Sequence, residues 1–167
     1  MCRTGRFYFP AILKSVKIKR IPFPEFKKIY SRVPRLCVEL ILIENKKILL
    51  VRRTIAPAAG LWHTPGGTVL KGETLGDTVR RVAKEETGSN VRVKEMLGVI
   101  EYHSFKNHYS QDISIAFLAE RKKHGQIDLD GHADKYEFFS IIPKNTIAEQ
   151  KEFLHKHLGF PISQKQA

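Results

Sequence analysis

Residues 66–89 read GGTVLKGETLGDTVRRVAKEETGS, in which a glycine-bearing loop leads into an amphipathic helix. Thr74 followed by Asp77 three residues later is typical of a helix N-terminus. Gly88 stands where a glycine in the left-handed conformation commonly ends a helix. The apolar residues of the segment recur at helical spacing and predict one buried face: Leu75, Val79, Val82 and Ala83.

Two adjacent carboxylates, Glu85 and Glu86, stand near the end of this predicted helix. Carboxylate oxygens hold hard cations such as Mg²⁺ or Mn²⁺, and such a cation neutralises phosphate oxygens and stabilises a charged leaving group. Gly66 and Gly67 let the backbone approach the cation closely, because a side chain there would collide. Arg81 can neutralise and orient the glutamates. Together these residues predict a metal site that acts on phosphate groups.

Outward from this segment, the apolar patterns predict several strands and helices. A strand hairpin is expected at 36–43 and 48–51, further strands at 91–103, 111–120 and 136–140, and helices at 25–31 and 146–157. The stretch 56–67 is rich in proline and glycine and is predicted to be a loop. This order predicts a mixed sheet with helices on its faces, an α+β or α/β sandwich.

Positive charge is concentrated at the N-terminal end of the chain. The 167 residues carry a formal net charge of +12. Residues 1–35 hold ten lysines and arginines against one acid, so +9 of that excess lies there. We therefore predict a basic extension at 1–22, one domain at 23–160 and a short tail at 161–167.

The composition excludes several classes of protein. No apolar run is long enough to span a membrane, and the distant Cys2 and Cys37 support neither a disulfide scaffold nor a zinc site. The apolar stretch 7–13 is short and has no small-residue cleavage site, so we expect no signal peptide and a cytoplasmic protein. The basic extension is expected to be solvated or packed in a dimer, with contact to nucleic acid or an anionic membrane as the alternative.

The spacing within residues 67–89 resembles the Nudix box, G-x5-E-x7-R-E-U-x-E-E-x-G-U, in which U is a bulky aliphatic residue. The matching positions are Gly67, Glu73, Arg81, Glu85, Glu86 and Gly88. Val82 replaces the glutamate after the arginine, and Ser89 replaces the last aliphatic residue. The resemblance implies the Nudix α/β/α sandwich, a divalent metal (Mg²⁺ or Mn²⁺), and a substrate built as a nucleoside diphosphate linked to another group.

This sequence also resembles one subfamily of the Nudix family, the GDP-mannose mannosyl hydrolases, which have an apolar residue at the position of Val82. Further stretches that resemble this subfamily are residues 53–67, 25–39 and 130–136, so the similarity covers about 23–160. Those enzymes break the sugar C1–O bond and release GDP and mannose. The resemblance therefore implies a nucleotide-sugar substrate, with GDP-mannose as the prime candidate, and a homodimer formed through the first helix.

The same resemblance implies roles for individual residues. His132 would be the general base on the attacking water, a role suited to imidazole near neutral pH. Arg53, together with the metal, would stabilise the departing diphosphate. Glu86 would be the principal metal ligand, the Gly66 carbonyl a second and Glu85 a third.

Two further residues are predicted to contact the substrate. Glu39 is expected near the sugar, and Trp62 is expected to stack on a base or sugar, with core packing as its alternative role. A glutamine ligand of the subfamily is Gly131 here, and its diphosphate-binding arginine is Thr68. The acids close to His132 that could supply the missing ligand are Asp128, Asp130 and Asp134.

Three functions are open from the sequence. The first is hydrolysis of a nucleotide sugar at its glycosyl carbon. The second is Nudix cleavage at phosphorus in an NDP-linked substrate or a nucleoside triphosphate, which the Glu85–Glu86 pair favours and which Val82 and His132 disfavour. The third is a weakly catalytic module that senses a nucleotide and touches nucleic acid with its basic extension.

Overall fold

The computed structural model describes residues 20–105 and 108–164. Its helices are α1 (Phe23–Tyr30), α2 (Leu75–Thr87) and α3 (Ala148–Leu158). Its strands are β1 (Arg35–Glu44), β2 (Lys47–Arg53), β3 (Trp62–His63), β4 (Gly66–Thr68), β5 (Val91–Glu101), β6 (Asp112–Arg121) and β7 (Ala133–Phe139). Residues 1–19 of the predicted extension and 165–167 of the predicted tail lie outside the described part.

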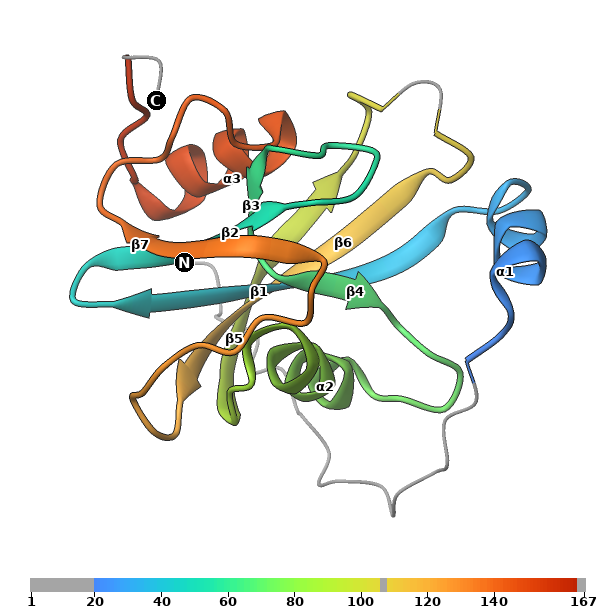
Figure 1. Ribbon diagram of the computed structural model, residues 1–167, viewed down its shortest axis with the longest axis horizontal. Helices are drawn as coiled ribbons and strands as arrows, with labels where there is room; N and C mark the ends of the chain where they lie inside the picture. Colours follow the sequence, from blue (N-terminus) through green and yellow to red (C-terminus); the bar gives the residue numbers. More distant parts are fainter. Residues whose placement is uncertain (1–19, 106–107, 165–167) are drawn as a thin grey trace, which may run out of the picture.

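Strand β1 is the centre of the sheet (Figure 1). It runs parallel to β6, and β5 pairs antiparallel with the far side of β6. On its other side, β1 pairs antiparallel with β4 over its first half and with β2 at its end. The sheet order is β3-β2-β1-β6-β5, with β7 beside β2. The single described sheet is therefore mixed, as predicted.

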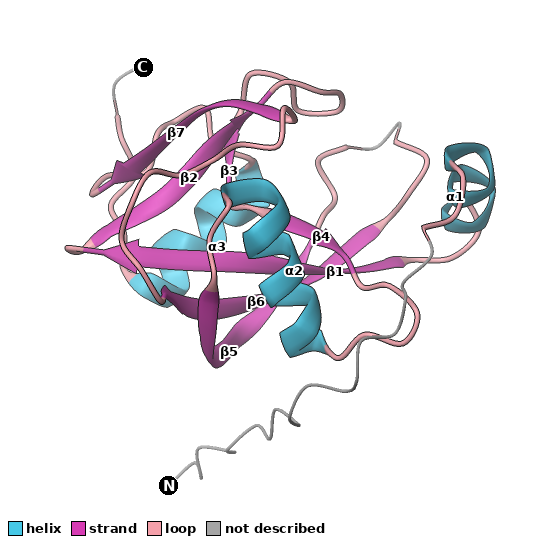
Figure 2. Ribbon diagram, turned by 60° about the horizontal axis from the view of Figure 1, so that its bottom comes forward, coloured by secondary structure: helices cyan, strands magenta, loops and turns pink. Residues whose placement is uncertain are grey.

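Helices cover both faces of this sheet, with α2 on one side and α3 on the other (Figure 2). The core under α2 includes Val38, Leu40, Leu42, Val79 and Val82. The core under α3 includes Ile41, Ile100, Phe153 and Leu154. Because successive residues of a strand point to opposite sides, β1 supplies side chains to both cores. The predicted sandwich of a mixed sheet between helices is confirmed.

Helix α2 begins and ends where the sequence predicts. The Asp77 N–H donates to Thr74 Oγ1 at 3.1 Å, and Gly88 adopts the left-handed conformation, with φ of 65°. The other predicted helices and strands are present, with ends within three residues of the predicted bounds.

The prediction of a loop over 56–67 is wrong in part, because this stretch contains β3 and the start of β4. Gly66 lies opposite Glu39 in β1, and Gly67 lies opposite Val38. A Cβ atom on Gly66 would lie 2.6 Å from Glu39 Oε2 and 2.8 Å from the Val38 carbonyl oxygen. The glycine pair therefore permits a close approach of β1 and β4. The proline and glycine content of the stretch 56–67 is nevertheless typical of a loop.

Helix α1 stands at one end of the molecule (Figure 1). None of its eight residues is buried. Phe23 and Phe26 contact Tyr109 edge-on, with 6.2 and 6.5 Å between ring centroids. Contacts between aromatic side chains, rather than a shared core, therefore attach α1 to the rest of the domain.

No helix in residues 20–105 or 108–164 is long and apolar enough to cross a membrane.

The replacement Gly66→Ala is expected to lower the free energy of unfolding by about 1–3 kcal/mol, because the added methyl group overpacks the β1–β4 contact. Urea unfolding followed by circular dichroism measures this change. Gly125→Ala is the matched control, because no atom lies within 4 Å of a Cβ built there. Equal stabilities of the two variants would contradict the close packing at Gly66.

Candidate active site

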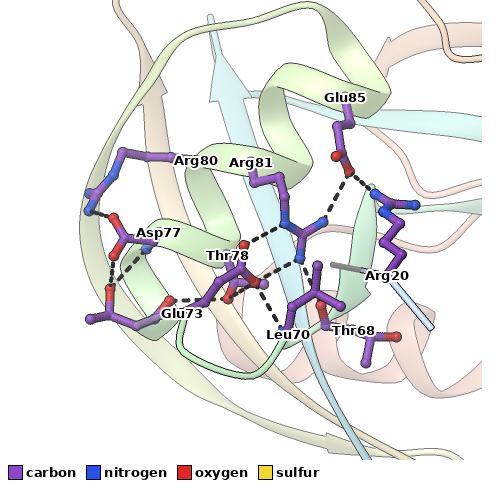
Figure 3. A network of polar contacts seen from close by, with 10 residues as sticks. Arg20, Thr68, Leu70, Glu73, Asp77, Thr78, Arg80, Arg81 and Glu85 are labelled. Carbon is purple, nitrogen blue, oxygen red and sulfur yellow. Dashed lines mark hydrogen bonds and ion pairs between the residues drawn. The ribbon is translucent and has the colours of Figure 1, made fainter. Parts of the chain in front are cut away.

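Arg81 connects helix α2 to the loop between β4 and α2 by hydrogen bonds (Figure 3). Its guanidinium donates to Glu73 at 2.6 Å to Oε1 and 2.9 Å to Oε2, and to the Thr68 carbonyl at 2.8 Å. Glu73 Oε2 also accepts hydrogen bonds from the Leu70 N–H and the Thr78 hydroxyl, both at 3.0 Å. The loop between β4 and α2 is thus fixed to the helix by charged hydrogen bonds.

Glu85 lies on the outer side of the same network (Figure 3). Its Oε2 accepts hydrogen bonds from Arg81 at 3.0 Å and from Arg20 at 2.6 Å, and the side chain is 41% exposed. Neighbouring residues of a helix point about 100° apart, so Glu85 and Glu86 face different directions. A metal-ligand role for Glu85 stays a prediction.

Glu86 faces the glycine pair. The Gly66 N–H donates to Glu86 Oε2 at 3.2 Å. The pKa of the Glu86 carboxyl is raised to about 8, first by burial and then by the negative charge of Asp130, against the hydrogen bond from Gly66. A bound cation would compensate both the lost hydration and the charge repulsion.

Asp130 holds His132 by two contacts. The His132 backbone N–H donates to Asp130 Oδ1 at 2.9 Å, and His132 Nδ1 lies 3.1 Å from Asp130 Oδ2. The His132 side chain is 67% exposed, whereas that of Asp130 is 22% exposed. An Nδ1–H donated to a carboxylate leaves Nε2 as the nitrogen that can accept a proton.

The structure distinguishes among the three acids close to His132. Asp134 forms a bidentate ion pair with Arg52. Asp128 packs against the end of α2, and a Cβ atom added to Gly88 would lie 2.8 Å from the Asp128 Cβ. Of the three, Asp130 is the one whose charge raises the pKa of Glu86. The sequence could not separate them, because adjacency along the chain was the only signal.

Arg53 stands at the end of β2, beside the loop that carries His132. The next residue, Thr54, donates its N–H to the His132 carbonyl at 2.9 Å and its hydroxyl to the Gly131 carbonyl at 3.2 Å. Burial lowers the pKa of the Arg53 guanidinium, and attraction to Glu86 opposes this. The strand end therefore places a positive charge near Glu86 and anchors the His132 loop.

His63 lies near the same groups, although the sequence analysis did not assign it to the site. Its pKa is lowered to about 4 by burial and by the positive charge of Arg53, so the ring is neutral at pH 7. Nδ1 lies 2.8 Å from the Thr64 carbonyl and donates to it, because a carbonyl only accepts. The signal in the sequence was its place shortly before Gly66.

Glu39 is buried under the glycine pair as the centre of a hydrogen-bond network. Its Oε1 accepts from the Tyr102 hydroxyl at 2.8 Å and the Ser114 hydroxyl at 2.9 Å. Its Oε2 accepts from the Thr64 hydroxyl at 2.7 Å and from Gln150 Nε2 at 3.2 Å. Burial raises the pKa of Glu39 to about 7, against the hydrogen bonds from Thr64, Tyr102 and Ser114. Both oxygens are thus engaged by protein groups, and contact with a sugar stays a prediction.

Trp62 is buried on β3 and packs edge-on against Phe139, with 4.8 Å between ring centroids. This is the core packing that the sequence left as an alternative, and a substrate contact for Trp62 stays a prediction.

The structure thus brings Gly66, Glu86 and Arg53 together with Asp130 and His132. Gly67, Glu73, Arg81 and Gly88 shape the loop and helix that hold them.

The oxygen-rich surroundings of Glu86 fit a hard cation. Within the described residues, no three His, Cys, Asp or Glu side chains form a ready-made metal cluster, so backbone oxygens and water would complete the shell. The Glu86 carboxylate is the donor that these contacts support, and the Gly66 carbonyl stays a predicted second ligand. Such a set suits Mg²⁺ or Mn²⁺, which keep several waters, better than zinc.

Comparison with known proteins agrees with this geometry. The NUDIX domain family model matches residues 33–156. The chain belongs to the Nudix family. The ADP-ribose pyrophosphatase of Methanocaldococcus jannaschii is 32% identical to this Nudix protein over 149 residues, which cover 88% of this chain and 83% of that one.

Two more similarities complete the comparison. The low-salt glycan biosynthesis protein Agl8 of Haloferax volcanii is 43% identical over 83 residues, which cover 50% of this chain and 53% of Agl8. The match thus spans about half the length of that relative. The MutT Nudix hydrolase of Burkholderia pseudomallei superposes with a TM-score of 0.65 at 23% identity, over 74% of this chain and 98% of that chain. This last likeness shows the shared fold alone.

Replacing Glu73 by Gln is expected to destabilise the Nudix fold at pH 7 by about 2 kcal/mol, because Arg81 loses a charged partner. Burial acts to raise the pKa of the Glu73 carboxyl. The hydrogen bonds that it accepts, the one from Arg81 foremost, outweigh burial, so the pKa is lowered. The stabilisation is therefore present above the unfolded pKa, about 4.3, and is lost as pH falls through the lower folded pKa.

Thermal unfolding of the wild type and Glu73→Gln between pH 7 and pH 3 measures this dependence. The difference in Tm should be largest at pH 7 and should shrink below about pH 4. Glu152→Gln is the control, because that carboxylate is 62% exposed and pairs only with Lys156 within the described chain. A difference that does not change with pH would contradict a role for the Glu73 charge.

Proposed function

We propose that this Nudix hydrolase cleaves a nucleoside diphosphate sugar by attack of water at the sugar C1, with GDP-mannose as the first substrate to test. The observation that carries the proposal is the hydrogen-bonded pair of Asp130 and His132 beside Glu86. A histidine held through Nδ1 can take a proton from water at Nε2 near neutral pH. Such a base speeds the attack of water at carbon.

In the proposed reaction, the water oxygen bonds to C1 while the bond from C1 to the diphosphate oxygen breaks. His132 Nε2 takes the proton of the water, and Asp130 stabilises the imidazolium that forms. Arg53 contacts the departing diphosphate and stabilises its charge. Glu86 and the Gly66 carbonyl would hold a divalent cation, which would neutralise the charge of the diphosphate.

The relatives support a substrate that contains a sugar. The name of one relative concerns ADP-ribose, in which a ribose is joined to a nucleoside diphosphate. The name of the other concerns glycan biosynthesis. These names agree on a sugar-linked substrate but leave the base and sugar open, so GDP-mannose is proposed from the sequence resemblance.

Cleavage at phosphorus is the second candidate. The observation that favours it is the relation to an ADP-ribose pyrophosphatase over 88% of this chain, because the name pyrophosphatase denotes a phosphoanhydride reaction. In that case the water would attack phosphorus and a nucleoside monophosphate would leave.

A homodimer, a cytoplasmic location and a nucleic-acid contact by the basic extension stay predictions, and residues 1–19 of that extension lie outside the described part.

Hydrolysis in ¹⁸O-labelled water separates the two reactions. GDP-mannose and ADP-ribose are incubated with the protein and Mg²⁺, and the products are analysed by mass spectrometry. The proposal predicts label in mannose and unlabelled GDP. Label in GMP or mannose 1-phosphate released from GDP-mannose would contradict attack at C1 and support cleavage at phosphorus.

Replacing His132 by Gln is expected to lower kcat by about 10²–10⁴-fold with little change in KM, because a general base acts on the rate and not on binding. Asp130→Asn should lower kcat by about 10–100-fold, the usual cost of losing a supporting carboxylate. Asp134→Asn is the matched control, because Asp134 pairs with Arg52 instead. Steady-state kinetics measure all three, and equal effects at positions 130 and 134 would contradict the assigned pair.

A further inference from the structure

A groove of about 410 Å³ lies between the end of α1 and the loop that joins β5 to β6. Figures 1 and 2 both show the described part of this loop on the same side of the molecule as α1. The volume is within the range of small-ligand sites, about 300–1,000 Å³. Six aromatic side chains line it: Tyr30, Tyr102, His103, Phe105, His108 and Tyr109. The groove is outside the group of residues assigned to catalysis above.

Strand β1 connects the groove to that group. Alternate residues of a strand share a face, so Arg35 lies on the same side of β1 as Glu39. The groove is lined by Pro34 and Gln111, the neighbours of the paired Arg35 and Asp112. Four residues of strand, about 13 Å, separate Arg35 from Glu39, which lies opposite Gly66.

Tyr102 makes the second connection. It lines the groove, and its hydroxyl donates to Glu39 Oε1 at 2.8 Å. Glu39 in turn packs against Gly66, whose N–H donates to Glu86. A chain of buried contacts through Tyr102, Glu39 and Gly66 therefore links the groove to Glu86.

The wall of the groove near β6 is polar and ordered by hydrogen bonds. The Ser110 hydroxyl donates to Asp112 Oδ1 at 2.7 Å and lies 3.1 Å from His108 Nδ1. Asp112 also accepts from Arg35 Nε at 2.8 Å. These contacts fix His108 and Ser110 at the edge of the groove, where their polar atoms can meet the edge of a planar heterocycle.

The aromatic rings differ in how much of their surface is already used. Tyr109 contacts the rings of Phe23 and Phe26 and has Lys27 Nζ 5.9 Å from its ring centroid. Phe105 contacts no other aromatic ring in the described part of the chain, and its side chain is half-buried. Among the lining residues that the structure describes, Phe105 is also the one aromatic ring without a polar atom, so it is the candidate for stacking on a ligand.

We propose that this groove binds the nucleobase of the substrate, with Phe105 stacking on the base and His108 and Ser110 at its polar edge. The assignment rests on the proposed function, since a nucleotide sugar whose C1 lies at His132 must extend its base well away from Glu86. An aromatic, partly polar groove suits a flat heterocycle better than a sugar, because stacking needs a planar partner.

Equilibrium binding of fragments tests the assignment without any turnover. The probes are 1,N⁶-ethenoadenosine 5′-monophosphate, whose fluorescence is quenched by stacking, and ribose 5-phosphate, which lacks the base. Phe105→Leu keeps an apolar side chain and removes the ring, and Tyr136→Leu, on the exposed side of β7, is the matched control. Phe105→Leu should weaken binding of the nucleotide about 5- to 100-fold, abolish the quenching and leave ribose 5-phosphate binding unchanged.

Photolabelling of the wild type with 8-azidoguanosine 5′-monophosphate, and separately with 8-azidoadenosine 5′-monophosphate, gives a readout that needs no variant. Label within residues 102–105, 108–111 or 30–34 is expected, and label confined to other peptides would overturn the proposal. Unchanged nucleotide binding by Phe105→Leu would overturn it as well. If the nucleotide binds as expected but no nucleoside diphosphate sugar is hydrolysed, the proposed function fails while the base site stands.

Discussion

The buried carboxylate of Glu39 is the interaction on which the arrangement of the site depends. It lies on β1 against Gly66 and accepts hydrogen bonds from four other parts of the fold: Thr64, Tyr102, Ser114 and Gln150. An unpaired acceptor in a buried position is costly, so a shift of any one of these elements is opposed by the rest. The network holds the glycine pair in place, and the Gly66 N–H in turn meets Glu86.

Around this centre the site has a rigid part and an exposed part. The rigid part is the loop and helix joined by Arg81 and Glu73, whose hydrogen bonds fix the backbone on which Gly66 and Glu86 lie. The exposed part is the loop of Asp130 and His132, anchored to Thr54 through two carbonyls. Phosphate and metal binding need fixed oxygens, whereas a general base must meet water. The division therefore matches the two tasks proposed for the site.

Prediction from sequence succeeded where the determining contacts are local. The start of α2 at Thr74 and its end at Gly88 depend on residues within one helical turn, and both are confirmed. It failed for β3 and β4, because their proline and glycine content is typical of loops and their strand character comes from pairing with β2 and β1. It also left open which acid accompanies His132, since three of them lie within four residues of it.

The sequence by itself determined the membership of the Nudix family, the helix that carries Glu86, and the concentration of positive charge at the N-terminal end. Only the tertiary structure decided that Glu39 is a buried structural centre, that the charge of Asp130 acts on Glu86, and that Glu85 is engaged by arginines. The reason is the range of the contacts. Helix caps and periodicity act over a few residues, whereas Glu39 and Gln150 are 111 residues apart and meet only because the sheet and α3 pack together.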